Sequence, residues 1–310
     1  MTRLPLPPRL ASDLQQVEQI LAERTRSRAA VISVAGTRLL QPGSDRTRAA
    51  LVLLAAGVSQ YRLERVIHAA AAVELIYAAT STHDALIDEA DRRRGTIRTG
   101  EWGHGVALMV GDYLFALAAG EMAQAPDPRV ISYYAQAVMR ISESALAPPP
   151  RVDQPDPARH LERLDGEASL VAAACRAGGA CVGAPTEHLE ALSRLGYAFG
   201  LALRLTTELR DFEEPVGDGQ IPASLRSGVV TLPLLYAAQS GNAQQLAAAF
   251  DSGQSTALAR VAEVVRLHGM GPTHTAIAGY LQEAELALAT LPSGPGRDDL
   301  ARAVRSLVHQ

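Results

Sequence analysis

The sequence predicts an all-α protein, a bundle of ten or more helices. Hydrophobic residues make up 47% of the 310 residues but aromatic residues only 4%, and the apolar residues are mainly Ala, Leu and Val. This composition favours close-packed helices over sheets. Segments of helical period follow one another between turns of Gly, Pro and Asp, without a β-hairpin signal or an internal repeat.

Charge and hydropathy limit the possible partners. The formal net charge is -4 and no long basic run occurs, which argues against nucleic acid as a partner. No segment reaches about 18 uninterrupted apolar residues, and the N-terminus lacks a signal-peptide core. We therefore expect a soluble cytoplasmic protein. Every basic residue is arginine and none is lysine.

The first half of the chain divides into helices at polar turns. Residues 11–32 are amphipathic, with Ser12 or Asp13 as the expected N-cap. A turn of Gly, Pro and Asp follows. Further helices are expected at residues 61–79, 103–124 and 128–146.

A proline-rich loop opens the second half. Residues 147–157 (APPPRVDQPDP) cannot be helical throughout, because proline removes a backbone donor. A second loop is expected at residues 213–222. Helices are expected at residues 158–183, 187–211, 243–268 and 272–308. Cys175 and Cys181 then share a helix about 9 Å apart, which is too far for a disulfide and suggests no redox or metal role.

An acidic stripe ends the helix that begins near residue 61. Asp84 and Asp88 are four residues apart and Asp91 is three further on, so a helix projects all three carboxylates from one face. Hard oxygen ligands at this spacing suit Mg²⁺, which is usually completed by substrate phosphates. The arginines that follow at residues 92–94 suit a diphosphate by bidentate pairing. A solvated helix end with ordinary charge pairs is the alternative that the pattern leaves open.

Four segments together resemble one family, the trans-isoprenyl diphosphate synthases or polyprenyl synthetases. HDALIDEADRRRG resembles the family's first aspartate-rich motif, H-D-D-x-x-D-E-A-D-x-R-R-G, with Ala85 in place of the second Asp. The other matching segments are GSDRTRAALVLLAAG at 43–57, MVGDYLFALA at 109–118 and GVVTLPLLYA at 228–237. Their order and spacing agree with the family over residues 40–240. The resemblance implies one isoprenoid-synthase-type domain over residues 1–310, a central cavity with two acidic motifs facing each other at its mouth, and a homodimer.

The resemblance also implies roles for individual residues. Asp84, Asp88 and Arg93 match catalytic positions, and the matched substrate-binding positions are Arg46, Arg48, Arg93 and Arg94. Asp84 and Asp88 match the metal ligands of the first motif.

The second acidic motif is degenerate. LALRLTTELRDF stands where the family has D-D-x-x-D, with Thr207 and Glu208 for the leading aspartates and Asp211 for the last. Glu208 and Asp211 are therefore weaker candidates for metal ligands than Asp84 and Asp88. A solvated helix end, with Arg210 pairing locally, is the alternative.

Four family positions that bind diphosphate have changed. Asp45, Glu167 and Val229 match the family's three lysines, and Tyr77 matches a histidine that helps to hold isopentenyl diphosphate. Arginine would have kept the charge in a chain that avoids lysine, so composition does not explain the loss. We expect a diphosphate-binding field that is weaker or differently arranged, above all for the second substrate.

The resemblance leaves three functions open. The first is a Mg²⁺-dependent prenyltransferase that elongates an allylic isoprenyl diphosphate with isopentenyl diphosphate. The second is a terpene synthase, which ionises the allylic diphosphate without condensation. The third is a catalytically silent subunit that pairs with an active homologue in a heterodimer. An enzyme is favoured because Asp84, Asp88 and Arg93 are intact; the sequence gives neither the chain length of the product nor the partner.

Overall fold

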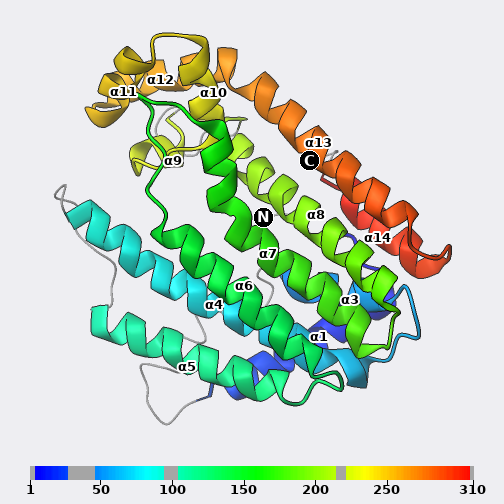
Figure 1. Ribbon diagram of the computed structural model, residues 1–310. Coiled ribbons are helices and arrows are strands. Elements are labelled where there is room, and N and C mark those ends of the chain that lie inside the picture. The colour runs from blue at the N-terminus through cyan, green and yellow to red at the C-terminus, as the bar shows by residue number, and fades with distance from the viewer. Residues whose placement is uncertain (1–3, 27–45, 94–103, 214–220, 308–310) are drawn as a thin grey trace.

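The fold is all-α, as the sequence predicts. The computed structural model describes residues 4–26, 46–93, 104–213 and 221–307, and for residues 84–93 and 104 the backbone alone. These residues form thirteen helices and no strand. The helices are α1 (Pro8–Arg24), α3 (Thr47–Ala56), α4 (Leu63–Arg93), α5 (His104–Met122), α6 (Arg129–Leu146), α7 (Pro157–Cys181), α8 (Thr186–Glu213), α9 (Ala223–Arg226), α10 (Leu232–Ser240), α11 (Ala243–Asp251), α12 (Ser255–His268), α13 (Met270–Ala289) and α14 (Pro295–Arg305) (Figure 1).

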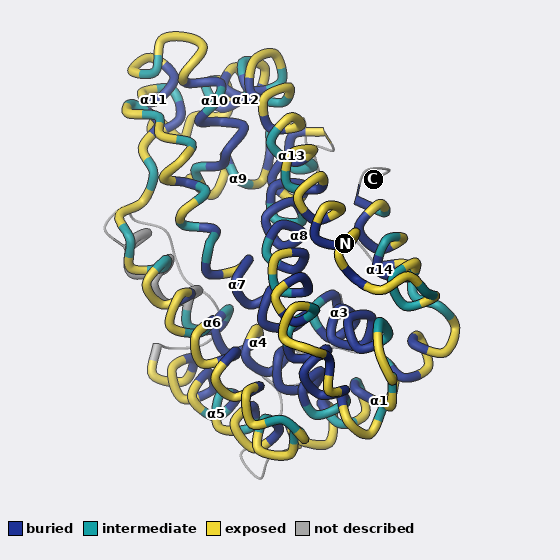
Figure 2. The backbone as a smooth tube through the Cα atoms, turned by 45° about the vertical axis from the view of Figure 1, so that its right-hand side comes forward, coloured by how far each residue is buried: buried dark blue, intermediate teal, exposed yellow. Residues whose placement is uncertain are grey.

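Helix α3 lies at the centre of the core. Nine of its ten residues are buried, and the tube is dark blue along it in Figure 2. It packs against α1, α4, α7 and α14. A ten-residue helix is marginal on its own in water, so α3 owes its stability to this packing.

Helix α4 carries the chain from the core to the first acidic motif. Its N-terminal half is alanine-rich and buried, including the run Ala69–Val73. The helix continues without a break through Asp84 and Asp88 to Arg93. The expected helical setting of the acidic stripe is therefore confirmed for the backbone.

Small residues let α7 and α8 pack very closely. A Cβ at Gly196 would lie 2.8 Å from the Cα of Ala172, and a Cβ at Gly200 would lie 2.9 Å from the Cα of Ala168. Glycine avoids both overlaps because it has no Cβ. The helices run antiparallel, and further along this contact Arg204 and Glu208 of α8 lie close to Glu167 and His160 of α7.

A second hydrophobic cluster closes one end of the bundle. Phe212 at the end of α8 packs there with Leu234 of α10 and with Val261 and Val265 of α12. Helices α9 to α12 form this cap at the top of Figure 1. Met270 packs against both this cluster and the main core. The cap brings the first turn of α10 against the C-terminal half of α8.

The start of the chain differs from the prediction. Helix α1 begins at Pro8, after Pro7, and ends at Arg24. Proline is favoured at the first helical position, where its missing N–H would have no partner in any case. The expected N-cap at Ser12 or Asp13 was therefore wrong, and Asp13 instead accepts a 2.7 Å hydrogen bond from the Tyr61 hydroxyl.

The end of the chain also differs, because its two long helical segments are both divided. Residues 243–268 form α11 and α12, separated at Gly253, whose φ of 63° is left-handed and costs glycine little. Residues 272–308 contain α13 and α14, and Pro295 begins the second of these. The proline-rich loop is confirmed, since α7 begins at Pro157 with the Asp156 side chain as its cap.

One described helical window, Gly105–Met122 within α5, is long and apolar enough to cross a membrane. A third of that window is buried. A single window of this kind is weak evidence for a membrane span, because core helices of soluble proteins have the same composition.

Candidate active site

The first acidic motif lies on the last turns of α4. Asp84 and Asp88 are one helical turn apart on continuous helix, and Arg93 is the last helical residue. Their side chains, and all of Arg94, lie outside what the structure describes. The C-terminal ends of α4 and α8 lie towards the same end of the bundle, with α7 between the two helices (Figure 1). The roles of these four residues stay predictions.

Helix α5 holds α4 directly before this motif. The Nε2 atom of His83 lies 3.2 Å from the carbonyl oxygen of Leu108 and 3.6 Å from a carboxylate oxygen of Asp112. Gly111 faces the imidazole, and a Cβ there would overlap the ring. Close packing of Gly111 on His83 therefore fixes the approach of α5 to the start of the motif.

Glu208 of the second motif is buried and fully engaged by protein groups. Its side chain is 2% exposed and accepts hydrogen bonds from Nε2 of His160, at 3.1 and 3.2 Å to its two oxygens. The backbone N–H of Leu232, at the start of α10, donates to it at 2.8 Å. Burial raises the pKa of Glu208, but the hydrogen bond and charge of His160 and the charge of Arg204 outweigh burial and lower it.

Asp211, the other weak metal candidate, joins the two ends of the loop after α8. Its carboxylate accepts 2.8 Å hydrogen bonds from the backbone N–H groups of Ala223 and Ser224 in α9. Thr207 is exposed, and its hydroxyl donates to the carbonyl oxygen of Leu203 one turn back. Each of these side chains therefore has a partner within the protein, and their assignment to a metal stays a prediction.

Arg204 connects this cluster to α7. Its Nε lies 3.6 Å from Glu167, and one of its Nη atoms lies 3.6 Å from Glu208. Burial lowers the pKa of Arg204, but the carboxylates of Glu167 and Glu208 and the phenol of Tyr77 raise it above its ordinary value. The sequence analysis missed both Arg204 and His160. The i,i+4 spacing of Arg204 and Glu208 was a signal for the first, whereas nothing local links His160 to Glu208.

The two predicted substrate arginines of α3 have different surroundings. Arg46 has a side chain only 4% exposed, at 3.7 Å from Glu18 and 3.9 Å from Glu74. Its positive charge is therefore paired with these two carboxylates inside the core. Arg48 is half-buried and its guanidinium carbon lies over the ring of Tyr77, 3.3 Å from the ring centroid. Arg48 is thus the one of the pair placed to meet a ligand.

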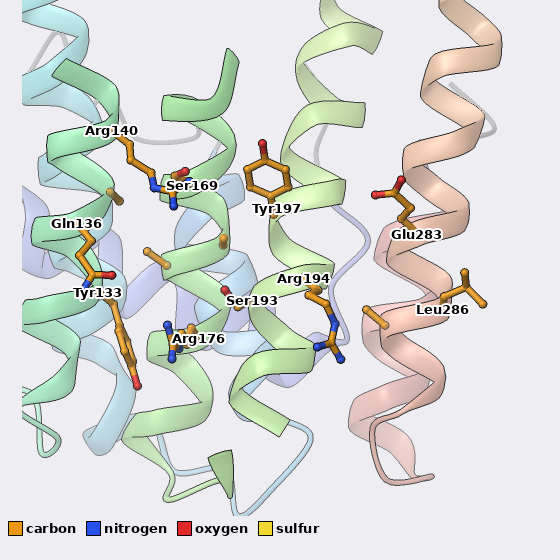
Figure 3. A pocket seen from close by; sticks show the side chains of 14 residues that line it. Tyr133, Gln136, Arg140, Ser169, Arg176, Ser193, Arg194, Tyr197, Glu283 and Leu286 are labelled. Atoms are coloured by element: carbon orange, nitrogen blue, oxygen red, sulfur yellow. The ribbon is translucent and has the colours of Figure 1, made fainter. Parts of the chain in front are cut away.

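A cavity of about 560 Å³ lies elsewhere, between α6, α7, α8 and α13 (Figure 3). Arg176 and Tyr133 line it, with the Arg176 guanidinium 4.3 Å from the Tyr133 ring centroid. Arg176 is nine residues from Glu167, which at about 100° per residue puts the two on opposite sides of α7. This cavity is therefore separate from the acidic motifs, and the predicted central cavity at their mouth stays a prediction.

Among the side chains that the structure describes, no group of three His, Cys, Asp or Glu residues could hold a metal ion. Cys175 and Cys181 are both free and buried, as expected from their spacing. Asp84 and Asp88, one helical turn apart, carry the oxygen donors that a hard cation prefers, and their assignment to a metal stays a prediction.

The comparisons with known proteins agree on one family. The polyprenyl synthetase family model matches residues 29–267. Heptaprenyl diphosphate synthase component 2 of Geobacillus stearothermophilus is 34% identical over 93% of this chain and 92% of its own length. Nonaprenyl diphosphate synthase of Mycobacterium tuberculosis is also 34% identical, over 93% of this chain and 90% of its own length.

Solved structures match the fold over nearly the whole chain. A polyprenyl synthase from Caulobacter crescentus, complexed with calcium and isoprenyl diphosphate, has a TM-score of 0.84 at 29% identity, covering 97% of this chain and 96% of its own. A decaprenyl diphosphate synthase from Rhodobacter capsulatus has a TM-score of 0.81 at 29% identity, covering 97% of both chains.

Proposed function

Because the chain belongs to the polyprenyl synthetase family, we propose that it is a prenyltransferase of isoprenoid biosynthesis acting on an allylic isoprenyl diphosphate. The observation that carries the proposal is the continuous helix of α4, which leads from the core to the first acidic motif, in a chain whose residues 29–267 match the family model. The relatives named for heptaprenyl and nonaprenyl diphosphates favour a long product. Ala79 and Thr80, small and buried directly before the motif, leave room for a long chain.

The reaction begins with loss of the diphosphate. The C–O bond of the allylic substrate breaks, the diphosphate leaves with the electron pair, and the double bond of isopentenyl diphosphate attacks the allylic cation before a proton is lost. Asp84 and Asp88 are the proposed ligands of Mg²⁺, which would stabilise the charge on the departing diphosphate. Arg48, Arg93 and Arg94 are proposed to bind diphosphate oxygens. The apolar core shields the cation from water.

Tyr77 and Asp45 weaken the proposed site for isopentenyl diphosphate. Arg48 is stacked on Tyr77, which favours a planar contact for its guanidinium. Asp45, which lies outside the described residues, matches a family lysine and so carries a negative charge in place of a positive one. Ionisation without condensation, a terpene synthase activity, is the alternative that this altered site favours.

The third candidate is a silent subunit. Two relatives carry the name heptaprenyl diphosphate synthase component 2, and the second motif has no carboxylate without a protein partner among the described side chains.

For the assembly, we favour a homodimer that covers the exposed apolar residues Leu108 and Met109 of α5. We also favour a single domain in the cytoplasm. Light scattering of the purified chain would distinguish a dimer from a monomer awaiting its homologue.

Product analysis tests the function. The protein is incubated with Mg²⁺ and C10, C15 or C20 allylic diphosphates, with and without isopentenyl diphosphate. Longer prenyl diphosphates support prenyl transfer, whereas hydrocarbons or alcohols formed at rates independent of isopentenyl diphosphate support the terpene synthase. No consumption under either condition supports the silent subunit. In the second case, Asp45→Lys with Tyr77→His should restore part of the condensation.

Metal binding is tested separately by titrating inorganic diphosphate with and without Mg²⁺, in the parent and in Asp88→Ala. We expect Mg²⁺-dependent binding in the parent that is lost in the variant. Equal, metal-independent binding in both proteins would exclude the proposed metal site.

A further inference from the structure

Arg204 lies beside Glu167, which matches one of the family's diphosphate-binding lysines, and beside Glu208 of the second motif. Its side chain is 31% exposed. Its Nε is buried and has no hydrogen-bond acceptor within the described part of the chain. The carboxylates of Glu167 and Glu208, at 3.6 Å, are close enough for ion pairing but too far for hydrogen bonds. A buried donor without an acceptor is costly, and a ligand oxygen would remove that cost.

Arg48 offers a second guanidinium with an unused donor. It reaches the Tyr77 ring from α3, and its Nε is also buried without an acceptor among the described residues. Guanidinium groups from two helices, each with an unused donor, suit a ligand with several anionic oxygens.

The two carboxylates that face Arg204 differ in mobility. Glu208 is held by His160 and by the N–H of Leu232, so it anchors the guanidinium from the buried side. Glu167 has a side chain that is 50% exposed, and its carboxylate lies 3.6 Å from the Nε of Arg204. An exposed ion pair contributes little, so Glu167 can turn into solvent when a ligand arrives.

We propose that Arg204 binds the diphosphate group of the substrate together with Arg48, and that Glu167 competes with the substrate for this arginine. This assignment rests on the proposed function, and it places one cation of the diphosphate site, Arg204, on α8. The Gly196 and Gly200 packing of α8 on α7 sets its position. Glu208 then acts as the anchor of Arg204, which agrees with its buried, fully hydrogen-bonded state.

The test is calorimetric titration of the full chain with inorganic diphosphate in the presence of Mg²⁺. Arg204→Gln should weaken binding by about tenfold or more, as expected for a lost charge-assisted contact. The matched control is Arg194→Gln, which removes the same charge from the same helix at a residue without an ion pair among those described, and should bind like the parent. Equal binding by Arg204→Gln and Arg194→Gln would overturn the proposal.

Glu167→Gln gives an independent result should Arg204→Gln fail to fold. Loss of the competing carboxylate should tighten diphosphate binding by about threefold or more, with exposed Glu190→Gln as the control for the change in net charge. If the ion pair of Arg204 and Glu167 is purely structural, Glu167→Gln should bind diphosphate as the parent does or more weakly. Either result would overturn the proposed competition.

Turnover of a C15 allylic diphosphate distinguishes failure of the role of Arg204 from failure of the proposed function. If the parent turns it over and Arg204→Gln binds normally, only the role of Arg204 fails. If the parent neither binds diphosphate nor consumes the allylic substrate, the proposed function fails, and the role of Arg204 fails with it.

Discussion

Glu208→Ala in metal-free buffer distinguishes a buried ion-pair anchor from a ligand in an empty metal site. In the structure, Glu208 accepts hydrogen bonds from Nε2 of His160 and from the N–H of Leu232, and its carboxylate neutralises part of the charge on Arg204. Alanine would leave all three without this partner. If Glu208 belonged instead to a cluster of metal-free carboxylates, its removal would relieve repulsion.

The expected cost follows from these contacts. Each buried donor left without an acceptor costs about 1–3 kcal/mol. Two such donors, with the partly exposed Arg204 adding less, give about 3–5 kcal/mol, the usual cost of breaking a buried pair. Glu208→Gln should cost less, because its amide oxygen can still accept one of the two hydrogen bonds.

The assay is urea and thermal unfolding in EDTA, without diphosphate. At about 2 °C per kcal/mol for a large domain, Glu208→Ala should lower the Tm by about 6–10 °C. A double-mutant cycle with His160→Ala should give a coupling of about 1–3 kcal/mol. An unchanged or raised Tm for Glu208→Ala would refute the anchor and favour the metal ligand.

The lowered pKa of Glu208 predicts a pH dependence of stability that Glu208→Gln removes. The pKa of Glu208 lies below its ordinary value of 4.5 in the folded protein. Its ionisation therefore stabilises the fold fully above that ordinary value, and the contribution is lost as the pH falls through the lower folded pKa. The free energy of unfolding should thus fall less steeply in acid for Glu208→Gln than for the parent.

Three further predictions concern packing around the site. In urea unfolding, Gly200→Ala should destabilise the protein by about 1–3 kcal/mol, because the added Cβ overlaps α7. The control is Gly120→Ala, which has open space around it and should be neutral or stabilising by up to about 1 kcal/mol. Gly111→Ala should displace the imidazole before the first motif and weaken Mg²⁺-dependent diphosphate binding in calorimetry; unchanged binding would contradict this. Burial raises the pKa of Cys175 and Cys181 to about 12, so both thiols should resist alkylation at pH 8 until urea unfolds the chain.

Much of the fold could be predicted from the sequence, because it depends on local chemistry. Helical period and low aromatic content predicted an all-α protein, and prolines predicted the loop before α7. The errors arose at helix ends, where the first turn of α1 uses Pro8 rather than Asp13 as its boundary signal. The Asp13 carboxylate instead accepts a hydrogen bond from the hydroxyl of Tyr61, 48 residues away in the sequence.

The candidate site was less predictable, because helical spacing gives the face of a residue but not what lies opposite. The sequence by itself determined that Asp84 and Asp88 share a face and that lysines are absent from the matching positions. Only the tertiary structure decided that Arg46 lies buried between Glu18 and Glu74 while Arg48 reaches Tyr77.

The second motif shows the same division most clearly. From sequence, Glu208 could be a metal ligand or part of a solvated helix end. The close packing of α7 on α8 brings His160 to it across 48 residues of chain, and the cap brings the N–H of Leu232. These contacts join segments distant in sequence, so the packed fold alone decided that Glu208 is buried and hydrogen-bonded to His160 and to the N–H of Leu232.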